Sequence, residues 1–444
     1  MKRLTDGRRS AGAVRPPPPG ASAEPVEVLV ERLGGRGDGV ALTADAQRLY
    51  IPGSLPGERV RARPGDARGD GYAAEIVEIL GPSPDRVQPP CPHFGRCGGC
   101  SLQHLDPEAY LAWKIGRLTG ALAKAGIAGY VLRPAVTVCS GERRRAALTA
   151  EKSAGGATVV LGFAETRSHA IVDLATCLVL DPRIVALLPP LRGLLGEILP
   201  LGRRTRIAVA LLDGGLDVVL DWPKPPPAAL FERLARFAHD ADLARLSWRK
   251  DASAPAEPVV QQRPALAVIA GLPVAVAPGC FLQATARGEA ALREAVLEGT
   301  KGAKAVADLF CGVGTFALPL AAAGARVQAI DADGEAVAAL AAATRADARV
   351  SAERRNLFVR PLSADELNRF AAVVLDPPRA GAKEQARALA ASKVPVAVCV
   401  SCNPDTFVRD AKILAAGGYR LVSLTPVDQF LWSAHLELAA VFAR

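Results

Sequence analysis

The alternation of apolar and polar residues divides the chain into regions with different patterns. From residue 25 to residue 87, short apolar runs such as VEVLVERL, RLYIPG and GYAAEIVEIL are separated by turns rich in glycine and proline. Several short strands joined by such turns are typical of a small β-barrel. We therefore predict an OB-like β-barrel over residues 23–87, preceded by a basic, proline-rich and disordered tail over residues 1–22.

A second pattern begins at residue 278. The apolar runs AVADLF, RVQAID, AAVVLD and PVAVCVS are separated by stretches of helical composition such as GEAVAALAAATRADA. Strands that alternate with helices form a parallel, doubly wound sheet. The pattern therefore predicts an α/β domain over residues 278–444, and the mixed signals of residues 88–277 predict a central α+β domain.

The central region contains one clear helix over residues 106–126. Asp106 is a suitable N-cap, and Pro107 fits the first helical position. Aromatic and apolar side chains at helical spacing predict its buried face: Tyr110, Trp113, Leu118 and Leu122. We expect this helix to pack on the C-terminal domain.

The composition of the chain indicates a globular protein with a net positive charge. The 444 residues are 50% hydrophobic and 22% charged, which fits a globular protein with a substantial core. Lys plus Arg number 54 against 45 Asp plus Glu, a net charge of +9 that suits a polyanionic partner. Five arginines in the predicted barrel suit either contact with a phosphate backbone or a solvated, charged surface: Arg32, Arg36, Arg61, Arg63 and Arg68.

The chain shows no signal for a membrane or for secretion. Its most apolar stretch, residues 184–202, is interrupted by prolines, Arg192 and Glu197, which disfavours a membrane span. The N-terminus lacks the apolar segment of a secretory signal, and PPPP at residues 16–19 disfavours the helix of an organelle transit peptide. Nine cysteines, an odd number, fit a reducing compartment better than disulfide bonding. We expect a cytoplasmic protein with no membrane partner.

The first strand of the α/β domain ends in a glycine loop. After Asp308 the sequence is LFCGVGTF, and a Gly-x-Gly turn at this place presents backbone N–H groups to a ligand. The third glycine of the dinucleotide pattern is missing and an acid precedes the loop, which favours S-adenosyl-L-methionine as the cofactor. The next strand ends at Asp331, whose carboxylate can accept two ribose hydroxyls or, alternatively, cap a helix.

Two later strand ends carry residues suited to chemistry on a pyrimidine ring. One reads DPPR from Asp376, and the other reads SCNP from Ser401. Pyrimidine C5 is barely nucleophilic, but addition of a thiolate at C6 places enolate character on C5, which can then accept a methyl group. A base must afterwards remove the C5 proton so that β-elimination releases the thiol. Cys402 is the candidate nucleophile, with an inert buried cysteine as the alternative, and Glu437 is the candidate base.

Another cysteine pattern lies before the predicted helix. Cys91, Cys97 and Cys100 read C-x5-C-G-G-C, and the glycines allow the sulfurs to converge on one centre. Four-cysteine sites hold either Zn²⁺ or an iron–sulfur cluster, so a distant fourth ligand is needed. Cys139 and Cys177 are the choices, and the spacing alone leaves both the metal and the fourth cysteine open.

Taken together, these motifs resemble the RNA (uracil-5-)-methyltransferase family, in particular its iron–sulfur, TRAM-domain branch that modifies 23S rRNA. The resemblance extends from about residue 25 to the C-terminus. The segments that carry it are FLQ at residues 281–283, DLFCGVGTF at 308–316, LDPPRAG at 375–381, SCNP at 401–404 and DQFLWSAHLE at 428–437. The order of LDPPR, SCNP and a terminal H-x-E is highly specific.

The resemblance implies an architecture and a role for each matching residue. The C-terminal domain would be a Rossmann-like methyltransferase domain, and the barrel a TRAM domain. Cys402 would be the nucleophile and Glu437 the base that takes the C5 proton. Residues expected to line the pocket for S-adenosyl-L-methionine or the target base are Gln283, Phe310, Thr315, Asp331, Asn356 and Asp376. A 4Fe–4S cluster would be held by Cys91, Cys97, Cys100 and Cys177.

Three places depart from the family pattern. Thr315 stands where the family often has asparagine, and Asp331 stands where it often has glutamate. The usual DMFP-like run here reads DQFLW from Asp428. The hydroxyl of Thr315 and the shorter acid of Asp331 keep the same kind of hydrogen bonding.

We therefore expect an enzyme that methylates C5 of a specific uridine in 23S rRNA, with RNA as its partner and no obligate protein partner. The target base must leave its stack to reach Cys402, so an RNA loop is the expected substrate. The alternatives are methylation of a tRNA uracil or of another base, and a non-enzymatic RNA-binding factor with a decayed site.

Overall fold

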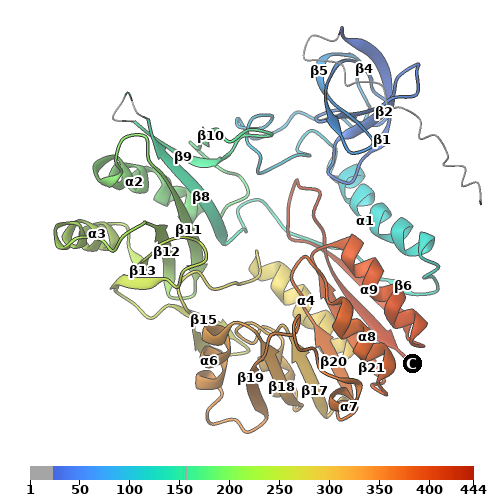
Figure 1. Ribbon diagram of the computed structural model, residues 1–444, viewed down its shortest axis with the longest axis vertical. Helices are drawn as coiled ribbons and strands as arrows, with labels where there is room; N and C mark the ends of the chain where they lie inside the picture. The colour runs from blue at the N-terminus through green and yellow to red at the C-terminus, as the bar shows by residue number, and fades with distance from the viewer. Residues whose placement is uncertain (1–23, 154, 156–157) are drawn as a thin grey trace, which may run out of the picture. The chain divides into compact units, whose positions relative to one another are not determined.

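The computed structural model describes residues 24–153, 155 and 158–444. These residues form two compact units (Figure 1), one of residues 24–88 with 104–106 and one of residues 89–103 with 107–444. The tail predicted over residues 1–22 lies outside the described residues. Within the described ranges, no helix is both long and apolar enough to cross a lipid bilayer.

The smaller unit contains a closed barrel of five strands in the order β1-β2-β3-β5-β4. Side chains alternate between its inside and outside, so Val28 and Val30 on one strand and Val60 and Ala62 on another fill its core. This barrel confirms the β-barrel predicted near the N-terminus and is consistent with an OB-like fold. Its strands are β1 (Val26–Leu33), β2 (Gly39–Leu42), β3 (Arg48–Ile51), β4 (Arg59–Arg68) and β5 (Gly71–Gly81).

Acids neutralise two of the five barrel arginines that the sequence singles out. Arg61 pairs with Glu78 at 3.0 Å, and Arg68 pairs with Asp38. Each of these pairs favours the solvated-surface alternative for its arginine, because a paired guanidinium adds little net charge for a phosphate. The other three, Arg32, Arg36 and Arg63, form no ion pair with any residue that the structure describes.

The larger unit contains a seven-stranded sheet in the order β10-β9-β8-β11-β12-β13-β14. Helices α2 (Pro182–Ile198) and α3 (Ala228–Asp240) pack against this sheet and share its apolar core with it. A two-stranded hairpin, β15 (Leu266–Ile269) and β16 (Leu272–Ala275), follows. The seven strands are β8 (Arg145–Lys152), β9 (Val159–Ala164), β10 (Ile171–Asp173), β11 (Arg204–Leu212), β12 (Gly215–Asp221), β13 (Leu243–Arg249) and β14 (Glu257–Gln261).

The C-terminal part of this unit is a nine-stranded sheet, with the strand order β19-β18-β17-β20-β21-β23-β22-β6 and with β7 paired to β22. The first five strands in that order are parallel, as predicted, while β23 runs antiparallel to both of its neighbours. The strands are β6 (Val131–Leu132), β7 (Val136–Thr137), β17 (Ala305–Leu309), β18 (Arg326–Asp331), β19 (Val350–Arg354), β20 (Ala372–Leu375), β21 (Val396–Ser401), β22 (Arg420–Asp428) and β23 (Glu437–Ala443).

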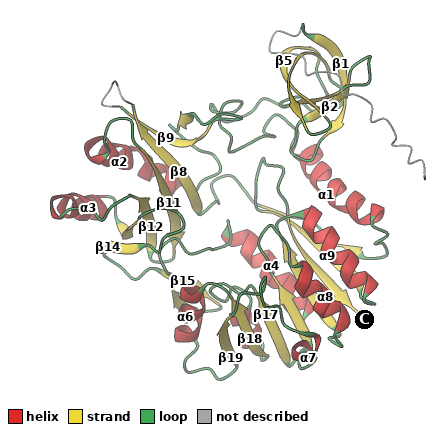
Figure 2. Ribbon diagram, viewed as in Figure 1, coloured by secondary structure: helices red, strands yellow, loops and turns green. Residues whose placement is uncertain are grey.

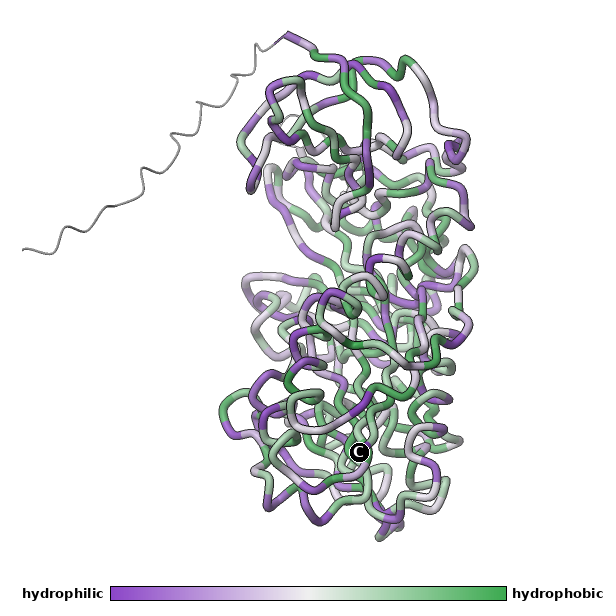
Figure 3. The backbone as a smooth tube through the Cα atoms, turned by 90° about the vertical axis from the view of Figure 1, so that its right-hand side faces the viewer, coloured by the Kyte–Doolittle hydropathy of each residue, from purple (hydrophilic) through white to green (hydrophobic). Residues whose placement is uncertain are grey.

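Helices cover both faces of this sheet (Figure 2). Because successive residues of a strand point to opposite faces, Val306 belongs to the core that includes α4, α5 and α6, whereas Ala307 belongs to the core that includes α1, α7, α8 and α9. Figure 3 shows hydrophobic stretches inside this region and mostly hydrophilic loops around it. The helices are α1 (Pro107–Lys124), α4 (Ala286–Gly299), α5 (Ala317–Ala322), α6 (Gly334–Ala343), α7 (Ala364–Leu367), α8 (Lys383–Ala391) and α9 (Pro404–Ala416).

Helix α1 confirms the helix predicted over residues 106–126, with one correction to its buried face. Trp113 is only partly buried, and the neighbouring Lys114 takes its place in the interior. The Lys114 Nζ lies 2.6 Å from Asp428 Oδ1 at the end of β22, and both side chains are almost fully buried. A lysine can replace an apolar residue here because its charge is paired and hydrogen-bonded.

We predict that Lys114→Met lowers the free energy of unfolding by about 3–5 kcal/mol, because it leaves the buried carboxylate of Asp428 without its partner. Urea denaturation followed by circular dichroism measures this loss. Lys124→Met, an exposed site on the same helix, is the matched control and should change stability by no more than about 0.5 kcal/mol. Equal effects of the two substitutions would contradict a stabilising role for the ion pair.

Candidate active site

The loop after β17 turns sharply at residues with positive φ. Phe310, Gly312 and Gly314 have φ values of 65°, 52° and 95°. Such a backbone is strained for a residue with a Cβ atom and easy for glycine. At Gly314 space matters as well, because a Cβ atom there would lie 2.6 Å from Cδ1 of Leu340. The turn between β17 and α5 therefore depends on glycine at this position.

Asp331, at the end of β18, ties this loop to the neighbouring strand. Its Oδ2 accepts a hydrogen bond from the N–H of Gly312 at 2.9 Å, and its Oδ1 accepts one from the N–H of Asp333 at 2.9 Å. The alternative role of Asp331 as a helix cap is wrong, because Asp333 caps α6. Asp331 is only partly buried, so its remaining lone pairs are open to hydroxyl groups of a ligand.

Asp308 lies on β17 just before the loop and is fully buried. Neither carboxylate oxygen accepts a hydrogen bond of ordinary geometry from the described residues. Burial, followed by repulsion from Asp376 and Asp331, raises the pKa of Asp308 to about 8. Three acids gathered at one sheet edge fit a cationic ligand, because its charge would offset both the burial and the repulsion. S-adenosyl-L-methionine carries such a charge on its sulfonium group.

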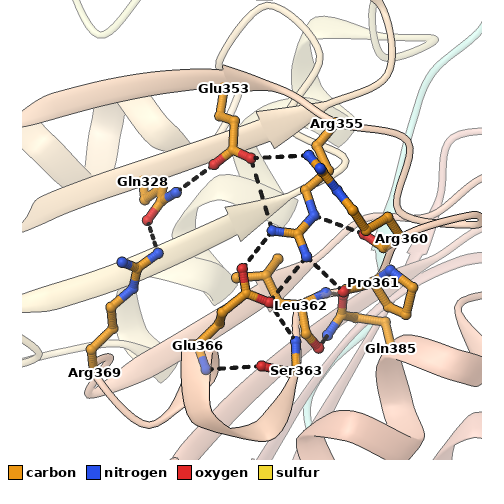
Figure 4. Close-up of polar contacts among 10 residues, drawn as sticks. All are labelled: Gln328, Glu353, Arg355, Arg360, Pro361, Leu362, Ser363, Glu366, Arg369 and Gln385. Atoms are coloured by element: carbon orange, nitrogen blue, oxygen red, sulfur yellow. Dashed lines mark hydrogen bonds and ion pairs between the residues drawn. The ribbon is translucent and has the colours of Figure 1, made fainter.

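Arg355 anchors the loop that follows β19 (Figure 4). Its guanidinium donates two hydrogen bonds to the carboxylate of Glu366, at 2.7 and 3.0 Å, and one each to the carbonyl oxygens of Arg360 and Pro361. Arg355 is 8% exposed, whereas the side chain of Glu366 is 39% exposed, so the ion pair is only partly shielded from solvent. A bidentate, partly buried arginine–carboxylate pair is among the stronger polar contacts in proteins.

The anchored loop carries Asn356 close to the glycine loop. The Asn356 side chain is exposed, and its Oδ1 accepts a hydrogen bond from the N–H of Phe358 at 3.0 Å. The rings of Phe358 and Phe310 have their centres 5.4 Å apart. Phe310 and Asn356, both predicted to line the site, are thus brought together. Thr315 is half-buried in the glycine loop, and its side chain forms no hydrogen bond with the residues described.

Arginines at the start of β8 hold the segment before α4. The Nε of Arg144 donates to the carbonyl oxygen of Gln283 at 2.9 Å, and Arg145 donates to the carbonyl oxygen of Leu282. The guanidinium of Arg145 also lies 4.3 Å from the ring centre of Phe281. These contacts fix the backbone of the FLQ motif and leave the Gln283 side chain, which is 3% exposed, directed into the site.

Cys402 lies between β21 and α9, where Asn403 caps the helix and Pro404 opens it. Burial raises the pKa of the Cys402 thiol to about 11, and the nearby carboxylates of Glu437 and Asp376 add to the shift, while Arg379 opposes it. The influence of both carboxylates on the thiol means that Cys402, Asp376 and Glu437 lie near one another. They come from the ends of three neighbouring strands, β21, β20 and β23.

The two carboxylates of this group repel each other. Glu437 is 4% exposed, and burial together with Asp376 raises its pKa to about 8. Burial and the charge of Asp331 raise the pKa of Asp376 to about 7. Carboxyl groups whose pKa values lie near neutrality can exchange protons at physiological pH, which suits general acid–base chemistry.

Two glutamine side chains connect these carboxylates. The Nε2 of Gln429 lies 3.0 Å from Glu437 Oε2 and 2.8 Å from Gln283 Oε1. The Nε2 of Gln283 donates in turn to Asp376 Oδ2 at 3.3 Å. The structure therefore brings Gln283 to the predicted nucleophile and base. It also adds Gln429, which reasoning from the sequence missed although the run DQFLW already departed from the family pattern there.

Arg379 and His435 form a second pair beside the thiol. Arg379 Nη2 lies 3.1 Å from His435 Nε2. Burial and nearby cations, Arg379 first among them, lower the pKa of His435 to about 4, so the ring is neutral at pH 7 and can accept from the guanidinium. Sequence reasoning did not assign either side chain, because only the fold brings the loop after β20 to the loop before β23.

The four predicted cluster cysteines line one cavity of about 220 Å³. Cys91, Cys97, Cys100 and Cys177 share it with Arg143, and burial raises the pKa values of Cys97, Cys100 and Cys177. The other candidate, Cys139, is exposed and does not line this cavity. The number and identity of the thiols fit an iron–sulfur cluster. Among the described residues, however, no three His, Cys, Asp or Glu side chains are arranged to hold a metal ion.

Comparison with known proteins places this geometry in context. A family model described as tRNA (Uracil-5-)-methyltransferase matches residues 275–444. A protein of Caulobacter vibrioides named "Uncharacterized RNA methyltransferase" is 42% identical, over 94% of this chain and 100% of its own length. A protein of Alkalilimnicola ehrlichii named "23S rRNA (uracil(1939)-C(5))-methyltransferase RlmD" is 35% identical, over 95% of this chain and 97% of its own.

A crystal structure of similar fold is the Pyrococcus abyssi tRNA (uracil-54, C5)-methyltransferase in complex with S-adenosyl-L-homocysteine. The TM-score is 0.73 at 23% sequence identity, and the match covers 94% of this chain and 99% of the other. At this level of identity, the likeness establishes the fold.

We predict that Gly314→Ala destabilises the protein more than Gly324→Ala does, by about 1–3 kcal/mol. Both glycines have positive φ, at 95° and 93°, so both variants carry similar backbone strain. Only at residue 314 would the new methyl group collide with Leu340, since a Cβ atom at Gly324 meets nothing within 4 Å. Urea denaturation of the two variants measures the difference in the free energy of unfolding. Equal destabilisation of the two variants would show that the collision with Leu340 does not destabilise the protein.

Proposed function

Because this chain belongs to the family of RNA (uracil-5-)-methyltransferases, which are enzymes, we propose that it methylates C5 of one uridine in 23S rRNA. The observation that carries this proposal is the proximity of the Cys402 thiol to the buried carboxylate of Glu437 and the half-buried carboxylate of Asp376 beside the glycine loop. A thiol nucleophile and a base that can both reach the same ring are what methylation of an unactivated ring carbon requires.

The cofactor of the family is S-adenosyl-L-methionine, which supplies an electrophilic methyl group. In our proposal, Asp331 accepts hydrogen bonds from the ribose hydroxyls, and the acids Asp308 and Asp376 lie beside the charged part of the cofactor. Other residues proposed to line the cofactor or base pocket are Gln283, Phe310, Thr315 and Asn356. Support comes from their common position at the carboxyl ends of the strands or in the loops beside them.

The proposed chemistry assigns one bond change to each side chain. The Cys402 thiolate adds to uracil C6, and the ring electrons move to C5, which becomes the nucleophile for the methyl group. Glu437 then removes the proton from C5, the C5–C6 double bond re-forms, and the Cys402 sulfur leaves with its electron pair. Burial keeps the Glu437 carboxylate a strong enough base for this step, since its pKa is raised to about 8.

The proposal also covers the class of RNA substrate and the roles of the domains. The relative named as acting on 23S rRNA favours ribosomal RNA over tRNA as the substrate. The N-terminal barrel would be a TRAM-like domain that holds RNA, and residues 88–277 and 278–444 would be the central and catalytic domains. A cytoplasmic location stays a prediction from the sequence.

We also propose that Cys91, Cys97, Cys100 and Cys177 hold a 4Fe–4S cluster with a structural or RNA-orienting role. The support is that these thiols share one cavity, although they are not drawn into ligand positions. The cavity also includes Arg379 and His435, so a cluster there would lie near the loops of the active site. Zinc is the alternative occupant.

The central test uses transcripts in which uridine is replaced by 5-fluorouridine. Fluorine cannot leave C5 as a proton would, so the enzyme should remain covalently attached to a 23S rRNA fragment in the presence of S-adenosyl-L-methionine, and not to tRNA. Cys402→Ala should abolish the adduct, detected as a band shift in denaturing gels, while calorimetry still detects cofactor binding. Cys399→Ala, on the strand β21 that ends just before Cys402, is the control and should keep the adduct.

An adduct in Cys402→Ala would contradict the proposed nucleophile. An adduct with tRNA transcripts alone would instead identify the alternative substrate and leave the chemistry unchanged.

For the cluster, we expect protein purified without oxygen to be brown and to contain iron and acid-labile sulfide. Cys177→Ser should lose most of the iron because it removes one proposed ligand, whereas Cys139→Ser should retain it because Cys139 lies outside the cavity. Elemental analysis measures both metals. Zinc in place of iron, or equal iron in the two variants, would refute the proposed cluster.

A further inference from the structure

Gln429 occupies a central place among the buried polar groups of the site. It directly follows β22, and its side chain is 2% exposed. Its amide nitrogen carries two hydrogens, which can be donated at the same time to Glu437 Oε2 and Gln283 Oε1. The backbone before it is fixed as well, because Asp428 pairs with Lys114. Gln429 is therefore held in place independently of any substrate.

The orientation of the Gln429 amide follows from its surroundings. If the amide were reversed, its oxygen would face the carboxylate of Glu437, which is unfavourable. The Oε1 instead faces the first turn of α4, where a Cβ atom on Gly288 would lie 2.9 Å from both Oε1 and Cβ of Gln429 and 2.8 Å from Oγ1 of the N-cap residue Thr285. Glycine inside a helix costs about 1 kcal/mol relative to alanine. At residue 288 the absence of a Cβ atom makes room for the Gln429 side chain and for the N-cap hydroxyl of Thr285.

In this arrangement the amide nitrogen of Gln429 makes hydrogen bonds, whereas its amide oxygen makes none with the described residues. The Oε1 is buried and accepts no hydrogen bond from the described residues. A buried acceptor without a donor is costly, so an apolar residue of the same size would be more stable at this position unless the nitrogen contributes something else. What the nitrogen contacts is the predicted base, directly, and Asp376, through Gln283.

We propose that Gln429 is a positioning residue that favours the ionised form of the Glu437 carboxylate and directs it into the site. This proposal rests on the proposed function, in which Glu437 removes the C5 proton. Gln429 also sets the amide of Gln283, since Gln283 must turn its oxygen toward Gln429 and its nitrogen toward Asp376. The Gln429 amide thus orients the Glu437 carboxylate directly and the Asp376 carboxylate through Gln283.

The groups that face Glu437 allow the sign of the effect to be worked out. Asp376 from the end of β20 and the Cys402 thiolate disfavour its charged form, whereas Arg379 and Gln429 favour it. On α4, Glu289 is neutralised by Arg144, so it adds little charge. Removing the donor of Gln429 must therefore raise the pKa of Glu437, and the base will be ionised only at higher pH.

The test measures release of tritium from C5-labelled uridine in RNA as a function of pH. Gln429→Met keeps the size of the side chain and removes the donor. We expect the acidic limb of its rate profile to move to higher pH, so that release at pH 7 falls about tenfold for every pH unit that the limb moves and recovers at alkaline pH. Gly288→Ala, which displaces Gln429 without replacing it, should move the profile in the same direction.

Two controls separate positioning from a loss of structure. Gln385 on α8 is also buried, but it bonds only the backbone of Leu362. Gln385→Met should lower stability without moving the pH profile. In addition, Gln429→Met should still form the covalent adduct with 5-fluorouridine RNA, because adduct formation precedes removal of the C5 proton.

The possible outcomes identify which idea fails. A rate that falls equally at all pH values, or a profile unchanged from wild type, overturns the role of Gln429. Absence of the adduct in the unsubstituted enzyme overturns the proposed function instead. An adduct in wild type that is lost in Gln429→Met would show that Gln429 acts before the base does, and would also overturn the inference.

Discussion

The half-buried carboxylate of Asp376 and the buried carboxylate of Glu437 lie near each other and near the Cys402 thiol, and the neighbouring side chains of the site compensate for their repulsion. Two like charges in a poorly solvated place repel and favour protonation. The surrounding groups offset this tendency: Arg379 supplies a positive charge, and the Gln429 and Gln283 amides donate hydrogen bonds. The balance leaves both acids with pKa values near neutrality.

The loop that carries Gln429, His435 and Glu437 is supported from a distant part of the sequence. Helix α1 supplies Lys114, whose Nζ contacts Asp428, and Tyr110, whose hydroxyl donates to the carbonyl oxygens of Phe430 and Ser433. These side chains satisfy backbone acceptors that the loop cannot satisfy itself. A helix outside the C-terminal sheet thus fixes the geometry of its last strand connection, which explains why a lysine is buried in α1.

The same principle holds on the other side of the site. The arginine that precedes β8 and the first residue of β8 bind the carbonyl oxygens of Gln283 and Leu282, and Arg355 binds those of Arg360 and Pro361. In each case a guanidinium, with its several fixed donors, holds a loop that has no regular hydrogen bonding. Side chains such as Gln283 and Asn356 can then meet a ligand with little loss of conformational freedom.

The sequence by itself determined the parts of this protein that depend on local order. Spacing and turn chemistry act over a few neighbouring positions. The sequence therefore predicted the barrel strands, the alternation of strands and helices, the glycine turn and the residues at strand ends. Placing Cys402, Asp376 and Asp331 at one edge also followed, since parallel strands align their carboxyl ends.

Only the tertiary structure decided the contacts between segments that lie far apart in the chain. The burial of Lys114 in place of Trp113 depends on Asp428, and the position of Gln429 depends on the space left by Gly288. The cavity that includes Cys177 and excludes Cys139 depends on how the loops fold over one another. The energy of a buried charge or amide is set by its partners across the fold, and that information is absent from spacing along the chain.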